Sequence, residues 1–400
     1  MMNTIIQILE KTYIRYSLFI LVYTITTLSI WKKYNYNPTS MINFGMEFAV
    51  QNKEKMPDGA VVILGNKDDL GAGYDGQIFY FYSRTISEWN MDWPKGFDES
   101  YRAPRIGYPL LVGVIGFFGK NASIFGMYFV NISLFLISYI LLRRMLDEDK
   151  KILSIFYLLS PFSLGSYAVL VSDSVMVSLV IIAYYFYLEE ENLYFVLVAS
   201  LAILCKEPAL FLFFPLGVKT ILEKRIPKAL LVLSILIIPI MWHVYLKVTF
   251  PNWRATRLTD FILPLEGIIT YSKSIAQTLN TTTDYKELAR LLSRFPLLVL
   301  LVTGLGILFT GNMKRGIEFR LGIALVFFMV STASYYHFWS VYENVSRMFT
   351  ISIPLFILLK NEEEDTKTGM YFFLSFLILI LFLVKVTLIQ KAQGYTIWGF

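Results

Sequence analysis

The sequence predicts an all-α polytopic membrane protein, and three observations indicate this class. Of the 400 residues, 56% are hydrophobic and only 16% are charged, whereas soluble domains carry about 45–50% apolar and about 25% charged residues. The mean hydropathy is +0.56. Apolar runs close to the length of a membrane span recur along the chain. We therefore expect residues 1–400 to form a single integral-membrane domain.

Eleven membrane-spanning helices are expected from the apolar runs. A span needs about 20 apolar residues, with about 17 as the lower limit. The run 193–222 is interrupted by Lys206-Glu207-Pro208 and is expected to form two short helices, because proline removes a helical hydrogen bond. The other nine spans are expected at residues 16–31, 124–142, 152–170, 174–188, 229–247, 295–310, 321–337, 345–359 and 369–388.

The positions of basic residues orient these helices. Cytoplasmic loops are enriched in Lys and Arg. The most basic short loops fall on one side only if the apolar run 105–118 lies in the membrane interface instead of spanning it. The N-terminus is then inside, the C-terminus is outside, and residues 32–123 and 248–294 form outer loops. The basic loops are residues 143–151, 219–228 and 314–320.

Composition and charge exclude several kinds of site and partner. Lys and Arg collect in short loops and give a net charge of +6, as expected beside anionic lipids, so membrane lipids and not nucleic acid are the expected partners. Cys205 is the only cysteine, which excludes an internal disulfide and a cysteine-based metal site. The two histidines, His243 and His337, are too few for the usual zinc site.

The first outer loop contains an acidic residue among glycines, in the stretch GAGYDGQIFY at residues 71–80. The glycines permit a tight turn, and apolar residues at helical spacing over 77–89 predict a second interfacial helix. Asp75 stands at the start of that helix. It is either an N-cap or a general base that accepts a proton from a substrate hydroxyl, and the two roles are compatible.

Other charged residues are expected at the same outer face. Arg102 and Arg105 either meet lipid headgroups or clamp a substrate phosphate. Asp173 is either an N-cap or a substrate-binding residue. Lys206 and Glu207 either pair with each other at a hairpin apex or, through Lys206, contact phosphate. Glu343 and Arg347 lie four residues apart, so they can pair on one helix face. Alternatively, Arg347 contacts a substrate phosphate. The substrate-binding candidates are Arg102, Arg105, Asp173, Lys206, Glu207, Glu343 and Arg347.

Three further features bear on this candidate site. His337 and Trp339 either line an acceptor cleft or belong to the interfacial aromatic belt. Metal dependence is left open by the sequence, because Asp75 and Asp173 could share a divalent cation; no other cofactor is indicated. The outer loop 248–294 is expected to help cover the site through Trp253, Arg254, Arg257 and Asp260.

The motif Tyr74-Asp75-Gly76-Gln77 resembles the first-loop motif of bacterial and archaeal GT-C fold glycosyltransferases, and it is close to the Trp-Asp-Gly motif of the GPI mannosyltransferase group. Tyr74 stands where the GPI enzymes have Trp. The resemblance continues in order from about residue 70 to 225 and returns near 343–354. The segments that carry it are Tyr101-Arg102 through Arg105-Ile-Gly-Tyr-Pro109-Leu-Leu, Ser160-Pro161, Ser172-Asp173, Lys206-Glu207-Pro208 and Glu343 with Arg347.

The resemblance implies a function for these residues. Members of the family move a sugar, such as mannose, from a polyprenyl- or dolichyl-phosphate donor to an acceptor hydroxyl, with inversion at the anomeric carbon. Asp75 matches the acid that acts at the acceptor, and Asp173 matches a second acid. The positions that match basic residues able to hold the lipid phosphate are Arg102, Arg105, Lys206 and Arg347.

The expected function is thus a multi-pass glycosyltransferase of a prokaryotic cell membrane, with its active site on the extracytoplasmic face. Its partners would be a lipid-linked sugar donor and a glycan, lipid or protein acceptor. The alternative is a transporter or flippase of a lipid-linked sugar, since outer-face cations and a broken helical hairpin suit that activity as well.

Overall fold

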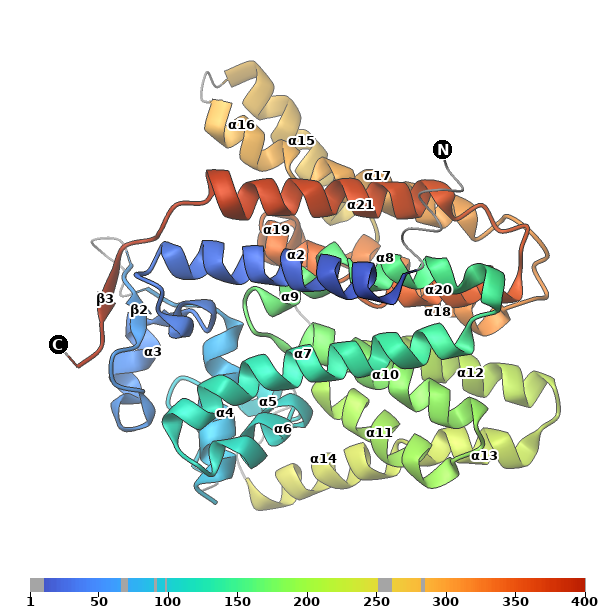
Figure 1. The fold of residues 1–400 in the computed structure, drawn as a ribbon, viewed down its shortest axis with the longest axis horizontal. Coiled ribbons are helices and arrows are strands. Elements are labelled where there is room, and N and C mark those ends of the chain that lie inside the picture. Colours follow the sequence, from blue (N-terminus) through green and yellow to red (C-terminus); the bar gives the residue numbers. More distant parts are fainter. Residues whose placement is uncertain are drawn as a thin grey trace.

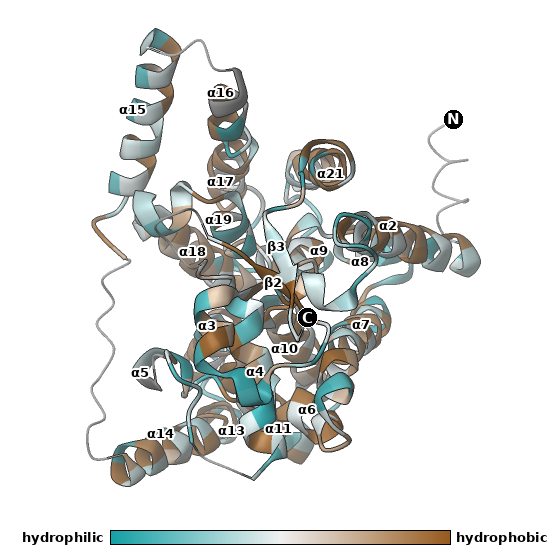
Figure 2. Ribbon diagram, turned by 90° about the vertical axis from the view of Figure 1, so that its left-hand side faces the viewer, coloured by the Kyte–Doolittle hydropathy of each residue, from teal (hydrophilic) through white to brown (hydrophobic). Residues whose placement is uncertain are grey.

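The computed structural model describes residues 11–65, 71–89, 92–97, 99–250, 261–281 and 285–399, and most of these are helical (Figure 1). The long helices α2 (Thr12–Lys32), α7 (Lys120–Met145) and α21 (Gly369–Val384) lie roughly along one axis in Figure 1. Figure 2 looks along this axis and shows hydrophobic residues on the outer surfaces of several helices. Large apolar side chains such as Met241 and Phe373 are exposed there, which is favourable in a bilayer and costly in water.

Five helical stretches are long and apolar enough to cross a membrane. They coincide with five of the expected spans, and they make the structure consistent with an α-helical membrane protein. The remaining expected spans correspond to shorter helices, so length and composition support five crossings and not eleven among the described residues. The five stretches are Thr12–Lys32, Lys120–Met145, Ile226–Thr249, Arg290–Ile307 and Gly369–Ile389.

Several expected spans are divided by breaks. The run 152–170 forms α8 (Ser154–Leu158) and α9 (Pro161–Tyr167), because Pro161 cannot continue the hydrogen bonding of α8 and the Ser160 hydroxyl accepts a bond from Ser163 N at 3.3 Å. The break expected at Lys206 is present between α11 and α12. The divided segments are α11 (Asn192–Cys205), η4 (Glu207–Ala209) and α12 (Leu210–Leu222); α13 (Ile226–Ser234) and α14 (Ile237–Thr249); α18 (Ile317–Thr332) and η5 (Tyr335–Trp339); and α19 (Tyr342–Arg347) and α20 (Ser352–Glu362).

The expected loop 32–123 contributes two strands to a small three-stranded sheet that the sequence did not predict. Strand β1 (Phe44–Gly45) pairs in parallel with β2 (Val61–Ile63), and β2 pairs antiparallel with β3 (Tyr395–Ile397). The C-terminal strand therefore lies at the same end of the bundle as this loop, as the expected topology requires (Figure 1). The loop also contains η1 (Pro38–Met41), α3 (Met46–Gln51), η2 (Lys53–Lys55), α4 (Asp75–Ser87), α5 (Glu99–Arg102) and α6 (Gly107–Gly116).

Helices α4 and α6 form where interfacial helices were expected, but α4 is packed inside the protein. It lies against α6 and α7, and most of its side chains are buried. Close packing depends on Gly113 of α6, where a Cβ would lie 3.0 Å from Ile86. Arg84 is buried as well and donates a hydrogen bond to Gly116 O at 2.7 Å. Helix α4 is thus covered by other helices of the protein, and its position relative to the membrane stays a prediction.

The expected outer loop 248–294 contains two helices. Helices α15 (Glu266–Thr281) and α16 (Tyr285–Leu292) stand out from the bundle beside α17 (Phe295–Ile307), as Figures 1 and 2 both show. Trp253, Arg254, Arg257 and Asp260, expected to help cover the site, lie outside the described residues. The remaining elements are η3 (Glu148–Leu153), α10 (Ser172–Leu188) and η6 (Lys385–Ile389).

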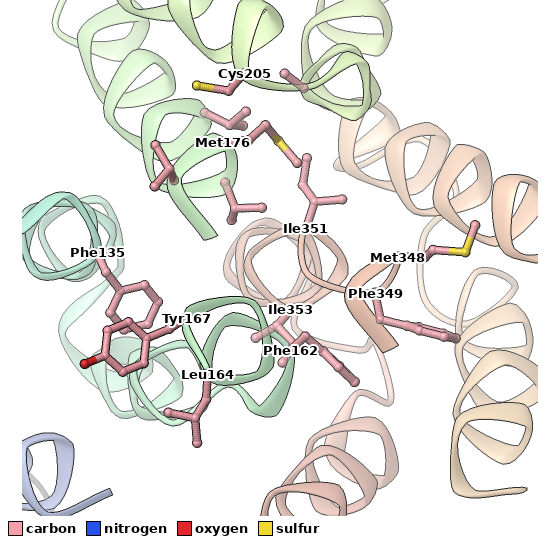
Figure 3. Close-up of a cluster of buried hydrophobic side chains, with 14 of the residues drawn as sticks. Phe135, Phe162, Leu164, Tyr167, Met176, Cys205, Met348, Phe349, Ile351 and Ile353 are labelled. Carbon is pink, nitrogen blue, oxygen red and sulfur yellow. The ribbon is translucent and has the colours of Figure 1, made fainter. Parts of the chain in front are cut away.

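A buried apolar cluster joins the central helices (Figure 3). Phe162 of α9 stacks on Phe349, which follows α19, with ring centroids 5.5 Å apart. Met348 and Ile351 lie in the same cluster, together with Met176 of α10. Packing in the core therefore fixes the C-terminal end of α19 relative to the start of α10, and both ends carry charged residues of the candidate site.

Candidate active site

Asp75 is held at the start of α4 by a glycine turn. Gly71 and Gly73 have φ of +86° and +69°, which other residues rarely adopt. A Cβ on Gly73 would lie 2.4 Å from Gly45 N, so the turn packs directly on β1. The Gln77 side chain fixes the turn by accepting from Gly45 N at 2.9 Å and donating to Ala72 O at 2.6 Å.

The N-cap role expected for Asp75 and Asp173 is replaced by ion pairing. The N-cap positions belong to Tyr74 and Val171, so both aspartates lie within the first turn of their helices. Asp75 pairs with Arg102 (Oδ1 to Nη1, 3.2 Å) and with Arg347 (Oδ2 to Nη2, 3.4 Å). The carboxylate of Asp75 therefore faces two cations.

The charges form one continuous chain of contacts. Arg347 Nη1 lies 3.4 Å from Asp173 Oδ2, and Lys206 Nζ lies 2.5 Å from Asp173 Oδ1. Three cations thus face two carboxylates, which leaves the cluster with a net charge of +1. The members come from α4, the ends of α5 and α19, the start of α10 and the break after α11. We call this group the ion-pair cluster: Asp75, Arg102, Asp173, Lys206 and Arg347.

Arg347 lies at the centre of the ion-pair cluster and has additional partners. Its Nη2 donates to Asn344 Oδ1 at 3.1 Å, and its guanidinium lies 5.2 Å from the centre of the Tyr74 ring. The Tyr74 hydroxyl donates to the same Asn344 oxygen at 2.6 Å. Sequence reasoning missed the contribution of Asn344, although its position three residues before Arg347 on α19 is a usable signal.

The pair between Lys206 and Glu207, one of the two alternatives, is not formed, because each side chain binds another residue. Lys206 pairs with Asp173 as described. Glu207 instead binds Arg105 through two contacts of 3.0 Å each, the forked geometry typical of an arginine–carboxylate pair. The Arg105 guanidinium also lies 4.1 Å from the centre of the Tyr101 ring.

The expected pair between Glu343 and Arg347 is also absent as a side-chain contact. The Glu343 carboxylate binds Lys385, and Arg347 Nε donates to the Glu343 backbone oxygen at 3.2 Å. Trp339, expected in a cleft or an aromatic belt, is fully buried and stacks on Tyr271 at 5.5 Å. His337 is exposed, and it is not among the residues that line the cavity beside the cluster.

The ion-pair cluster borders a cavity of about 70 Å³. This volume is far below the roughly 300–1,000 Å³ of typical ligand sites, so a sugar and a phosphate can bind only if the cavity opens. Its lining combines charged and apolar side chains. The apolar lining comes from Ile78, Phe79, Tyr82, Phe338 and Met348, and the charged lining adds Arg105 to the ion-pair cluster.

The cations determine the charge state of Asp75. Burial disfavours the charged carboxylate, but the guanidinium groups of Arg347 and Arg102 outweigh it and lower the pKa of Asp75 from 3.8 to about 2. The side chain remains 37% exposed, and Asp75 is one of the residues that line the cavity. Asp75 is therefore ionised at neutral pH and accessible to a bound molecule.

The two carboxylates do not fit a shared divalent cation. Arg347 contacts both of them, at 3.4 Å each, and so occupies the position that a bridging metal would require. Within the part of the chain that the structure describes, no three His, Cys, Asp or Glu side chains gather into a possible metal-binding group.

No protein-family model, no curated protein and no solved structure matches this chain.

Proposed function

We propose that the chain is an integral-membrane glycosyltransferase. It moves a sugar from a polyprenyl- or dolichyl-phosphate donor to an acceptor hydroxyl at the outer membrane face, with inversion at the anomeric carbon. The proposal includes the GT-C-like layout of eleven spans, six of which are formed by the shorter helices. The observation that carries it is the ion-pair cluster, in which one accessible aspartate lies among cations beside a half-apolar cavity.

The charge balance of the cluster suits an anionic donor. A lipid phosphodiester carries one negative charge, which matches the excess of one cation in the cluster. Arginine forks bind phosphate oxygens well, so Arg102 and Arg347 can exchange their carboxylate contacts for phosphate contacts. The apolar residues that line the cavity, such as Phe79 and Phe338, would receive the first isoprene units of the lipid.

The same exchange activates Asp75. A carboxylate with a pKa of about 2 is a weak base at neutral pH. When the donor phosphate engages Arg102 and Arg347, the charges that hold this pKa down are neutralised, and the basicity of Asp75 rises. The base thus becomes effective only when the donor is bound.

The chemical step then follows from the arrangement. Asp75 accepts the proton of the acceptor hydroxyl, whose oxygen attacks the anomeric carbon of the sugar. The bond between that carbon and the phosphate oxygen breaks, and the electron pair leaves with the lipid phosphate. Attack opposite the leaving group inverts the configuration. Negative charge grows on the phosphate in the transition state, where Arg347, Arg102 and Lys206 stabilise it.

A transporter or flippase for a lipid-linked sugar is the second candidate. The break between α11 and α12, with Lys206 at its apex, is the observation that favours it, because discontinuous helices often form transport sites. Purified protein in detergent micelles separates the two functions, since micelles have no compartments. Transfer of labelled sugar from a polyprenyl-phosphate donor to an acceptor supports the enzyme. Movement of the donor across proteoliposomes without transfer in micelles contradicts it.

A further inference from the structure

Glu343 and Arg347 lie one helical turn apart on α19, a spacing at which a carboxylate and a guanidinium normally interact. In this structure the Arg347 guanidinium is directed to Asp75 and Asp173 instead. The Glu343 carboxylate is bound by Lys385. Glu343 therefore has two possible partners, Arg347 and Lys385, and in this structure it binds Lys385.

Lys385 reaches Glu343 from a distant part of the sequence. It is the first residue of η6 (Lys385–Ile389), directly after the long helix α21. Its ammonium also lies 4.8 Å from the centre of the Tyr342 ring, next to Glu343 on α19. Both side chains of the pair are about two-thirds shielded from solvent, with exposures of 30% for Lys385 and 33% for Glu343, so the contact is only partly screened.

The position of Lys385 is itself fixed by a second lysine. Lys33, at the C-terminal end of α2, donates from Nζ to Val386 O at 2.6 Å. This bond ties the backbone of η6 to α2. The ends of α2, α21 and α19 are thus connected, and the connection ends one helical turn from Arg347.

We infer that Lys385 is a positioning residue for donor binding. It holds the Glu343 carboxylate away from Arg347 and so leaves both guanidinium arms for Asp75, Asp173 and, in turn, the donor phosphate. Without the Lys385 charge, Glu343 becomes a third carboxylate competing for Arg347. The inference rests on the proposed function in that it names the phosphate as the ligand of Arg347.

The kinetic test uses a variant and its suppressor. Lys385→Met should raise the KM for a polyprenyl-phosphate sugar about tenfold, within the range for coupled charges in one network, and leave the KM for the acceptor unchanged. Removing the competitor as well, in Lys385→Met with Glu343→Gln, should restore the donor KM. Lys391→Met, at an exposed lysine six residues further on, is the matched control. A double variant as impaired as the single one, or a single variant with an unchanged donor KM, would overturn the inference.

Two readouts keep this result separate from the proposed function. Binding of farnesyl phosphate to the detergent-purified protein should weaken about tenfold in Lys385→Met and recover in the double variant. An experimental structure of Lys385→Met should show the Glu343 carboxylate on the Arg347 guanidinium. If the wild type bound no farnesyl phosphate and transferred no sugar, the proposed function would fail. The structure of the Lys385→Met variant would still decide the positioning role. That role would be refuted if Arg347 kept its contacts with Asp75 and Asp173 unchanged in the variant.

Discussion

Replacing Asp75 by Asn should separate donor binding from sugar transfer. Asparagine keeps the size of the side chain and removes one negative charge, so the net charge of the ion-pair cluster rises from +1 to +2. Arg102 and Arg347 then meet the donor phosphate without a competing carboxylate. At the same time the base that accepts the hydroxyl proton is lost. Donor affinity should increase while turnover falls.

The size of both effects can be worked from the structure. At an effective dielectric constant of about 20, a phosphate about 6 Å from the Asp75 carboxylate is repelled by about 3 kcal/mol. The Asp75 side chain is 37% exposed, and solvent screening reduces this repulsion to about 1 kcal/mol, which is about fivefold in Kd. Removing a general base lowers kcat by about 10²–10⁴-fold.

The assay combines a binding measurement with a transfer measurement on the same detergent-purified protein. Farnesyl phosphate titration gives the Kd, and transfer from a labelled polyprenyl-phosphate sugar gives kcat. Asp58→Asn, at an exposed aspartate of the same loop, is the control and should change neither value. Weaker phosphate binding by Asp75→Asn, or transfer close to that of the wild type, would refute the role given to Asp75.

Three other perturbations have defined outcomes. Since the pKa of Asp75 is lowered to about 2, kcat/KM should not fall through protonation of this group between about pH 8 and about pH 4. The value of kcat should fall at a higher pH, because the bound phosphate engages the arginines and raises the pKa of Asp75. An acidic fall at the same pH in both profiles would contradict the exchange of arginine contacts from Asp75 to phosphate. The pairing of Asp75 also contributes stability that is present above its ordinary pKa of 3.8 and lost as the pH falls towards 2. Gly76→Ala should lower Tm, since a Cβ would lie 2.6 and 2.7 Å from two backbone carbonyl oxygens, at a cost of about 1–3 kcal/mol. The control Gly369→Ala should leave Tm unchanged, because there is open space around Gly369. Arg347→Lys should raise the donor KM about tenfold, because an ammonium cannot reproduce the two-armed contact; an unchanged KM in donor titrations would place the phosphate elsewhere.

The sequence predicted which charged residues would lie together, but not all of their pairings. Loop charges alone brought Asp75, Arg102, Asp173, Lys206 and Arg347 to one end of the bundle, and the structure joins these five in one cluster. This succeeded because topology depends on charge counts and apolar lengths, which a sequence shows directly.

The local pairs that were one of the alternatives are not formed, because a distant residue binds one member of each. Spacing along α19 favoured Glu343 with Arg347, and adjacency favoured Lys206 with Glu207. The observed partners, Lys385 for Glu343 and Arg105 for Glu207, come from other segments. A helical period describes neighbours on one helix, and it carries no information about a side chain that arrives from elsewhere in the fold.

The burial of α4 against other helices was not predicted for a similar reason. Its apolar residues at helical spacing suit an interfacial helix as well as a buried one. What buries α4 is the close approach of α6, which depends on the missing side chain of Gly113. The small sheet was missed because its strands, such as Phe44–Gly45, are too short to show an alternating pattern.

The most direct test of the central claim is product analysis with a panel of polyprenyl-phosphate sugars and candidate acceptors, using the purified protein in micelles. Mass spectrometry gives the amount of glycosylated acceptor and of released lipid phosphate, and NMR gives the anomeric configuration of the new bond. The account predicts one lipid phosphate released for each sugar transferred, with the configuration inverted relative to the donor. No transfer from any donor in the panel, or a product that retains the donor configuration, would contradict it.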